Sequence, residues 1–130
     1  MKQKFKKVAV GGTFDELHKG HKTLLLKAFE IGEHILIGLC SDEFAEKMGK
    51  PHITTRYDER LKELNLFLIN QKLKDKAEIV LLNDSFGNTT TDKTIEALVV
   101  SEETKKIALK IFRSTIKLNK HLEIIASLAV

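Results

Sequence analysis

Cysteine is almost absent from this sequence, because its 130 residues include only Cys40. A single cysteine allows no intrachain disulfide and excludes a zinc site built from several cysteines. This usage fits a reducing compartment, so we expect a cytoplasmic protein. Cys40 ends an apolar run, which favours a small buried hydrophobic residue over a reactive thiol.

Aromatic residues, proline and long apolar segments are also scarce. The sequence has no tryptophan, one tyrosine and one proline, so neither stacking platforms for single-stranded nucleic acid nor Pro-rich linkers are evident. No segment is long and apolar enough to cross a bilayer, and the basic start MKQKFKK lacks the apolar region of a signal peptide. We therefore expect a protein that binds neither nucleic acid nor membranes.

The residues that are present suit one compact domain. Hydrophobic residues make up 42% of the chain, and this length supports a single domain over residues 1–130 but is too short for two ordinary ones. The formal net charge of +4 is compatible with an anionic partner, although excess lysine also serves solubility. Charge alone therefore identifies no partner.

Short apolar runs alternate with segments of helical periodicity. The runs predict strands buried on both faces, at residues 7–10, 35–40, 78–82, 97–101 and 122–127. Apolar spacing predicts a helix from about Gly20 to Ile31, ended by Gly32, and further helices opened by Ser41, by a capping box of Thr55 and Asp58, and by Ser101. This order predicts an α/β fold: a single Rossmann-like, doubly wound domain with a five-stranded parallel sheet flanked by helices.

The first predicted strand-to-helix corner carries the main functional signal. Gly11 and Gly12 lack a Cβ atom, so the backbone there can adopt positive φ values and a ligand can approach main-chain N–H groups, although glycine also simply permits tight turns. A helix that begins near Gly20 directs the positive end of its dipole at the same place. His18 and His21 flank this helix start, where either imidazole can donate a hydrogen bond to phosphate. The corner predicts a phosphate site at the carboxyl end of the sheet.

Other phosphate and metal motifs are missing. The sequence contains no G-x-x-x-x-G-K-[ST], no G-x-G-x-x-G and no G-x-S-x-G, which argues against P-loop NTPases, dinucleotide oxidoreductases and α/β-hydrolases. The two histidines lie three residues apart, whereas zinc proteases space theirs by four and place a glutamate after the first. We therefore expect no protein-bound zinc.

Three stretches of the sequence resemble a known family. GGTFDELHKGH is similar to the T-x-(x)-H-x-G-H signature of the nucleotidyltransferase superfamily, through Thr13, His18, Gly20 and His21. The fuller GGTFDELHKGHKTLL, with SDEFAEK after the second predicted strand and ALVVSEET at the fourth, resembles the archaeal and eukaryotic type of the phosphopantetheine adenylyltransferase family. The resemblance covers most of the chain. It implies adenylyl transfer from ATP to 4′-phosphopantetheine, giving dephospho-coenzyme A and pyrophosphate in coenzyme A biosynthesis.

The resemblance also implies roles for residues of the corner. His21 would stabilise the transition state at the α-phosphoryl group, and His18 would contact the triphosphate. Thr13, with Gly12 and Phe14 around it, would contact the phosphate of the pantetheine substrate or of the nucleotide. A Mg²⁺ ion would accompany the triphosphate, since hard divalent cations commonly bridge phosphate oxygens.

The acceptor phosphate needs positive charge on the other side of the site. In the family a lysine of the region after the short helix binds the acceptor, and Lys50 is our first choice, although most lysines on such a loop are simply solvated. Lys47, Arg56 and Arg60 lie in the same loop and helix start and are the alternatives.

The fourth predicted strand leads to a second possible contact with the nucleotide. Ser101 is expected to cap the helix that follows, with Thr104 supporting it, which explains both residues without a ligand. Because they stand beside the expected switch point of the sheet, we still expect their backbone to border the nucleotide.

The end of the sequence departs from the family. Relatives continue into an ISST-like segment that holds triphosphate and adenine, whereas this sequence stops at IIASLAV. We expect the C-terminal tail to be lacking, either through truncation or because the nucleotide site is completed differently.

Three other functions are alternatives to this adenylyl transfer: a glycerol-phosphate cytidylyltransferase, an FAD synthetase and a noncatalytic nucleotide-binding module. The VSEET run argues against the first two, and the pair of histidines argues against the third. The sequence predicts no oligomeric state.

Overall fold

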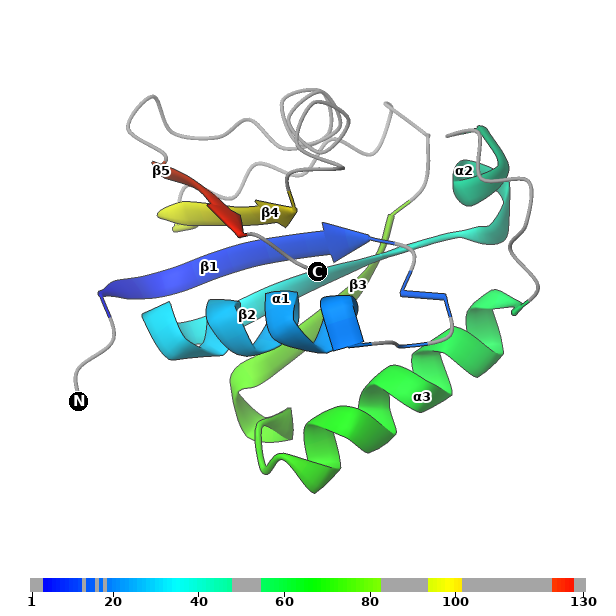
Figure 1. Ribbon diagram of the computed structural model, residues 1–130, viewed down its shortest axis with the longest axis horizontal. Helices are drawn as coiled ribbons and strands as arrows, with labels where there is room; N and C mark the ends of the chain where they lie inside the picture. Colours follow the sequence, from blue (N-terminus) through cyan, green and yellow to red (C-terminus); the bar gives the residue numbers. More distant parts are fainter. Residues whose placement is uncertain are drawn as a thin grey trace.

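The computed structural model describes residues 4–12, 14–15, 17, 19–47, 55–82, 94–101 and 123–127. Helices and strands follow one another along these residues, and Figure 1 shows them as one layer of strands with α1 and α3 beside it. Their bounds are β1 (Phe5–Gly12), α1 (Lys19–Ile31), β2 (Gly32–Cys40), α2 (Asp42–Lys47), α3 (Tyr57–Asn70), the 3-10 helix η1 (Lys74–Lys76), β3 (Ala77–Leu82), β4 (Ala97–Ser101) and β5 (Glu123–Ser127).

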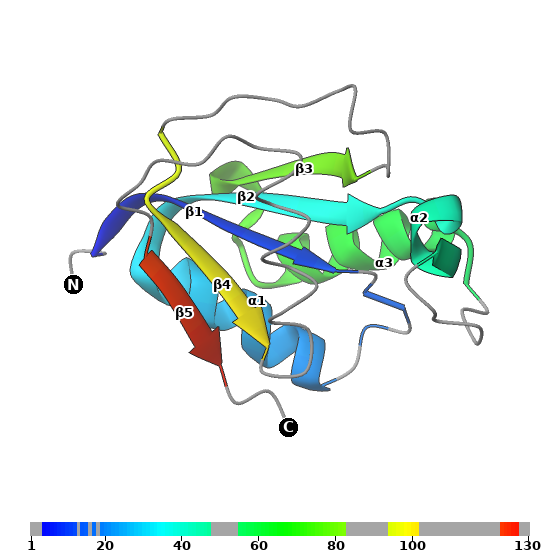
Figure 2. The ribbon, with the colours of Figure 1, turned by 90° about the horizontal axis from the view of Figure 1, so that it is seen from above.

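The strands form one sheet in the order β3-β2-β1-β4-β5, and every pairing is parallel. From β1 the chain first extends the sheet through β2 and β3, and it then returns to the other side of β1 for β4 and β5 (Figure 2). This strand order is that of doubly wound sheets, which bind ligands at the carboxyl ends of the two strands where the order reverses. Here these strands are β1 and β4.

The predicted α/β class, a parallel sheet flanked by helices, is confirmed. The described longer helices, α1 and α3, lie on the same face of the sheet in both ribbon views. The helix predicted after Ser101 lies outside the described residues, so the cover of the other face stays a prediction. None of the helices in the described part of the chain is long and apolar enough to span a membrane.

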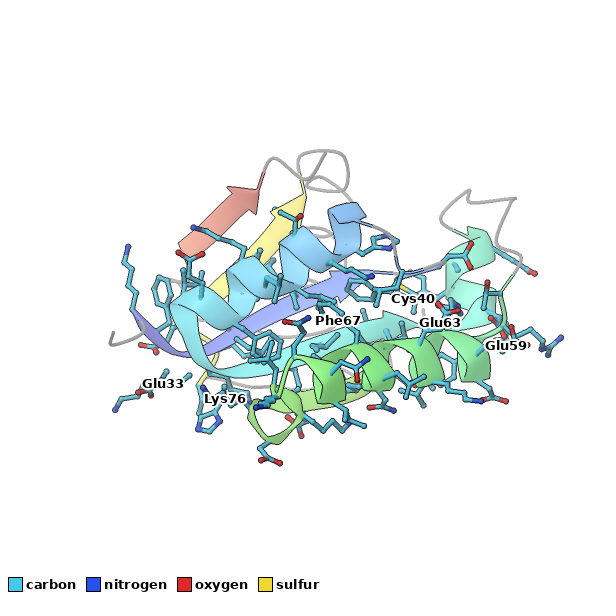
Figure 3. The ribbon with its side chains drawn as sticks, turned by 60° about the horizontal axis from the view of Figure 1, so that its bottom comes forward. Glu33, Cys40, Glu59, Glu63, Phe67 and Lys76 are labelled. Carbon is cyan, nitrogen blue, oxygen red and sulfur yellow. The ribbon has the colours of Figure 1, made fainter. Side chains whose placement is uncertain are left out.

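The core lies between the sheet and these two helices. Val8, Ile37 and Val99 point from three neighbouring strands into the core and are fully buried, as are Leu25 of α1 and Leu64 of α3. Burying one such side chain contributes about 1.5–3 kcal/mol. Figure 3 shows Phe67 between α1 and α3, where the two helices meet. This packing fixes the ends of α1 and α3 relative to the carboxyl edge of the sheet.

Two predicted helix boundaries have a different physical basis from the one expected. The capping box of Thr55 and Asp58 is wrong: Arg56 is the N-cap of α3, without a side-chain capping bond. The N–H of Tyr57 instead donates to Asp42 Oδ1, at 2.9 Å. Gly32 follows α1 as expected but begins β2, and a Cβ atom there would lie 2.6 Å from Val8. Gly32 is needed for close packing against β1.

Two smaller predictions are confirmed. Ser41 caps α2, because its Oγ accepts a hydrogen bond of 3.0 Å from the N–H of Phe44. Cys40 is 1% exposed and packs with Phe44, Ala45 and Leu82. It is a small apolar residue of the core.

Candidate active site

The candidate site lies where β1 ends and α1 begins. In Figure 1 the arrowhead of β1, the first turn of α1 and helix α2 lie at the same end of the molecule. Gly11 and Gly12 are the last residues of β1 and pair in register with Gly38 and Leu39 of β2. The glycines therefore continue the extended strand, and the backbone does not use the positive φ values that glycine permits there. Their pairing with β2 keeps the backbone extended up to the corner itself.

The left-handed backbone conformation falls on Phe14, whose φ angle is 50°. Such a conformation costs a residue other than glycine about 1–3 kcal/mol, and it persists where the surrounding structure fixes it. Here the Phe14 ring is 1% exposed and belongs to the core. The expected contact of Phe14 with a phosphate can therefore involve only its main chain, because the ring is covered.

The ring of Phe14 supports the catalytic candidate His21. The two rings meet edge to face, with centroids 5.4 Å apart and an interplanar angle of 75°. His21 itself is half-buried in the first turn of α1, directly after the buried Gly20. A half-buried imidazole braced on one side by a buried ring has a restricted orientation, which suits a group that must meet one phosphate oxygen.

The first turn of α1 contains no acidic side chain. A helix N-terminus carries a partial positive charge, and Asp or Glu residues usually compensate for it there. This turn contains Lys19 and Lys22, whose charges add to the positive potential. This helix end therefore favours an external anion such as phosphate.

Asp15 is the residue of this corner that the sequence analysis did not single out. Its Oδ1 is buried and has no hydrogen-bond partner in the described part of the chain. A buried carboxylate oxygen without a partner is costly, and it commonly marks a place for a ligand or an ion. Asp15 directly follows Phe14, the left-handed residue of the corner. The sequence analysis considered that conformation only at the glycines, and so it did not draw attention to Asp15.

The other side of the switch point is formed by β4. Val10 of β1 pairs with Val99 of β4, so Gly12 and Ser101, each two residues further on, reach the same level of the sheet edge. The backbone of Ser101 pairs with Ser127 of β5. Ser101 thus lies beside the glycine corner, as its expected role requires.

Four predicted site residues lie outside the described residues: Thr13, His18, Lys50 and Thr104.

Arg60 was one alternative for binding the acceptor phosphate, and the structure contradicts this. Its side chain is fully buried and donates to the carbonyl oxygens of Cys40 and Thr55 and to Asp42 Oδ1. A guanidinium held by internal acceptors cannot also face a substrate. Burial also raises the pKa of the neighbouring Tyr57 phenol, an effect that the positive charge of Arg60 opposes.

The opposite edge of the sheet, where the strands begin, lacks the positive character of the candidate site. Figure 3 shows Glu33 and Lys76 at this edge, away from Cys40 and Glu59. An open hollow of about 300 Å³ lies there, and its lining contains Lys7, His34, Asp75, Lys76 and Glu78. Lys7 pairs with Glu78 at 3.9 Å. Because acidic and basic side chains alternate in this hollow, it offers no preference for an anion.

Comparison with known proteins identifies the family of the chain. A family model described as cytidylyltransferase-like matches residues 9–126, from the second half of β1 into β5. The chain therefore belongs to the cytidylyltransferase-like family.

Individual relatives define the group more narrowly. The chain is 47% identical over 124 residues to a phosphopantetheine adenylyltransferase of Pyrococcus horikoshii, covering 95% of this chain and 78% of that protein. It is 49% identical over 109 residues to the protein of the same name from Pyrococcus furiosus, covering 84% and 68%. A crystal structure of a protein of unknown function from Archaeoglobus fulgidus is similar with a TM-score of 0.72 and 32% identity, covering 93% and 88%. At this identity and coverage, the group is that of the archaeal phosphopantetheine adenylyltransferases.

Proposed function

We propose that this chain is an enzyme that transfers the adenylyl group of ATP to 4′-phosphopantetheine, giving dephospho-coenzyme A and pyrophosphate in coenzyme A biosynthesis. The observation that carries this proposal is the position of His21 on a helix start without acidic side chains, beside the carboxyl end of β1. The identity to relatives named for this reaction supports the choice of both substrates.

The reaction needs alignment and charge stabilisation rather than a protein nucleophile. A phosphate oxygen of the acceptor attacks the α-phosphorus in line, the new P–O bond forms, and the bond to the β-phosphate oxygen breaks as pyrophosphate leaves. Negative charge grows on the nonbridging oxygens and on the leaving group. In this proposal His21 donates a hydrogen bond to a nonbridging oxygen of the α-phosphoryl group. Such a donor contributes about 2–4 kcal/mol to transition-state stabilisation.

The remaining residues of the corner would bind the two polyanions. His18 would contact the triphosphate, and Thr13 with the main chain of Gly12 and Phe14 would contact a phosphate. Gly11 would leave room for this approach. The extended backbone of β1 up to Gly12, and the left-handed turn at Phe14, support the proposal because they direct main-chain groups toward the switch point.

Magnesium is part of the same proposal. No group of three His, Cys, Asp or Glu side chains in the described ranges could hold a metal ion. Mg²⁺ would therefore be held mainly by the phosphates of ATP, and it would neutralise part of their charge when bound. Asp15 fits as a protein partner, because its buried Oδ1 lacks a hydrogen-bond partner among the described residues.

The acceptor and the nucleotide base would extend to either side of the corner. Lys50 would bind the acceptor phosphate, and the backbone of Ser101 and Thr104 would border the nucleotide. We also propose one domain over residues 1–130, doubly wound as in Rossmann-like folds, and a cytoplasmic location. The strand order supports the single doubly wound domain, and the presence of only one cysteine is compatible with the cytoplasmic location.

Pyrophosphate release tests the proposal. The protein is incubated with magnesium and either ATP or CTP, and each nucleotide is combined with 4′-phosphopantetheine, glycerol phosphate or FMN. We expect turnover with ATP and 4′-phosphopantetheine alone. Turnover only with CTP, or only with another acceptor, would assign the chain to a different transferase. Nucleotide binding without turnover in any combination would make it a noncatalytic module.

A further inference from the structure

Two residues other than glycine have a left-handed backbone in the described part of the chain: Phe14, with a φ angle of 50°, and Lys72, with 59°. Lys72 directly follows the C-cap of α3, and its N–H donates to the carbonyl oxygen of Ile69. A left-handed residue at that position is an ordinary way to end a helix. Phe14 instead follows a strand, since β1 ends at Gly12. The strained conformation of Phe14 therefore needs another reason.

The buried ring of Phe14 supplies that reason. The side chain is 1% exposed and belongs to the same core cluster as Val10 of β1 and Leu25 of α1. A strained backbone persists where the surrounding packing fixes it, and a buried phenyl ring is one of the largest apolar contributions that a side chain can make. The left-handed turn thus places a large, rigid ring in the core at the corner that the proposed reaction uses.

The tip of this ring points at Gly12. A Cβ atom on Gly12 would lie 3.6 Å from Cζ of Phe14, 3.7 Å from Cε2 and 3.8 Å from Cε1. These three atoms form the far end of the phenyl ring, and such distances are ordinary packing contacts. The same ring meets the imidazole of His21 edge to face, with centroids 5.4 Å apart. One buried ring therefore faces the last residue of β1 and also contacts the first turn of α1.

We call these three groups the Phe14 spacer: the ring of Phe14, the main chain of Gly12 and the imidazole of His21. Gly12 is held independently of the ring, because it pairs in register with Leu39 of β2. His21 is half-buried, and a side chain of this kind can adopt several rotamers unless its neighbours restrict them. Since the ring is rigid and its tip meets a fixed strand, the ring determines where the imidazole can lie relative to Gly12.

We propose that Phe14 is a positioning residue whose ring fixes the distance and the angle between the main chain of Gly12 and the imidazole of His21 before ATP binds. In the proposed reaction both groups meet phosphoryl oxygens, so their relative position decides whether His21 is aligned with the α-phosphoryl group. The inference rests on the proposed function for what the two groups bind, while the spacer itself is defined by the contacts above. A ring that only filled the core would affect stability alone.

Two substitutions of phenylalanine by leucine test the inference by enzyme kinetics. Phe14→Leu removes the ring that His21 meets, whereas Phe29→Leu removes a ring of the same core cluster, 6% exposed and further along α1. Both variants lose similar apolar volume, so their melting temperatures should fall by similar amounts. We expect kcat to fall about threefold to tenfold in Phe14→Leu alone, which is the scale of one aromatic contact.

The two Michaelis constants separate positioning from binding. Both KM values of Phe14→Leu should stay within about twofold of the wild type, because pairing with β2 keeps Gly12 in place and only the alignment of the imidazole is lost. An unchanged kcat in Phe14→Leu, an equal fall of kcat in both variants, or a change that appears only in KM would overturn the positioning role.

Proton NMR of the wild type tests the contact without activity and without a variant. Rings that meet edge to face bring their protons close enough for nuclear Overhauser cross-peaks. We expect cross-peaks between the rings of His21 and Phe14 in the nucleotide-free protein, and we expect them to remain when a non-hydrolysable ATP analogue is added with magnesium. His34, at the start of β2, is the internal control and should show no cross-peak to Phe14. Cross-peaks that are missing, or that appear only with the analogue, would show that the imidazole is not positioned in advance.

These measurements distinguish a failure of the spacer from a failure of the proposed function. If the wild type turns over its substrates but the cross-peaks are missing or Phe14→Leu keeps its kcat, the spacer is refuted and the proposed function stands. If the wild type shows no turnover with any nucleotide and acceptor, the proposed function is refuted, and the role of the spacer in that reaction is refuted with it.

Discussion

The start of α1 differs from the starts of α2 and α3 in its charges. The first turn of α1 has no acidic residue, whereas α2 begins with Asp42 and Glu43, and α3 has Asp58 and Glu59 in its first turn. Each carboxylate at such a position typically stabilises a helix by about 0.3–1 kcal/mol. Two helices therefore neutralise their positive ends with carboxylates of their own first turn, whereas the first turn of α1 contributes none to this task. In the proposed reaction the phosphates of ATP perform it.

The two corners at this edge of the sheet differ in a second way. The corner after β1 holds Phe14 in a strained left-handed conformation and contains a buried oxygen of Asp15 without a described partner. In the corner after β2, the polar groups around Arg60 satisfy one another. Polar groups without a protein partner can bind a ligand, whereas polar groups that hydrogen-bond to one another hold the structure in place. Substitutions in the two corners should therefore have different consequences.

Replacing His21 should have the largest effect, and the effect should be confined to activity. In His21→Ala we expect kcat/KM to fall at least about 100-fold, as on removal of a hydrogen-bond donor to a developing oxyanion. The melting temperature should change little, because the side chain is only half-buried. His34→Ala, at the opposite edge of the sheet, is the control and should retain full activity. A large fall in melting temperature would make His21 a structural residue.

Replacing Arg60 should have its main effect on stability. Arg60→Met fills similar volume but leaves the carbonyl oxygens of Cys40 and Thr55 without their donors, so we expect a loss of about 3 kcal/mol in the free energy of unfolding. Urea denaturation measures this loss, with Lys62→Met on the exposed side of α3 as the control. A loss below about 1 kcal/mol would show that the buried charge does not hold the corner together.

Replacing Phe14 by leucine should separate orientation from binding. The variant keeps an apolar side chain in the core but loses the edge-to-face contact with His21. Aromatic contacts of this kind contribute about 0.5–1.5 kcal/mol, so we expect kcat to fall about threefold to tenfold with little change in either KM. Steady-state kinetics test this, and an unchanged kcat would show that the ring does not orient the imidazole.

A charge change at the start of α1 should give the smallest effect and should act in opposite directions on stability and on ATP binding. Compared with Lys22→Gln, which also removes the cation–π contact with Phe67, Lys22→Glu should be more stable by about 0.5 kcal/mol. It should also raise KM for ATP severalfold, because the carboxylate competes with phosphate for the helix end. If Lys22→Glu is more stable but KM for ATP is unchanged, the nucleotide does not bind at this helix.

The parts of the molecule that follow from local periodicity were predictable. Nearly continuous apolar runs located the strands, because the burial of a strand depends on a short stretch of sequence. The residue types around Gly12 and His21 indicated the candidate site, which stays a prediction. The resemblance to a family added the reaction and its substrates, which no spacing rule could have supplied.

The parts that failed depend on partners distant in the sequence. From the sequence alone, Arg60 would be expected to be a solvated charge on α3. Only folding brings it into contact with Cys40, which lies 20 residues earlier. The predicted cap from Thr55 failed for the same reason, since Asp42 supplies the acceptor. The left-handed residue is Phe14 rather than a glycine because pairing with β2 keeps Gly12 extended.

The most direct test of the central claim is an NMR titration of the histidine rings. The ring resonances of His21 and His34 are followed while a non-hydrolysable ATP analogue is added with magnesium. The two residues stand at opposite edges of the same sheet, so His34 is an internal reference. We predict that the His21 resonances shift as the analogue saturates its site while those of His34 stay in place. Saturable binding that leaves His21 unperturbed, or that shifts His34 as much, would contradict the account.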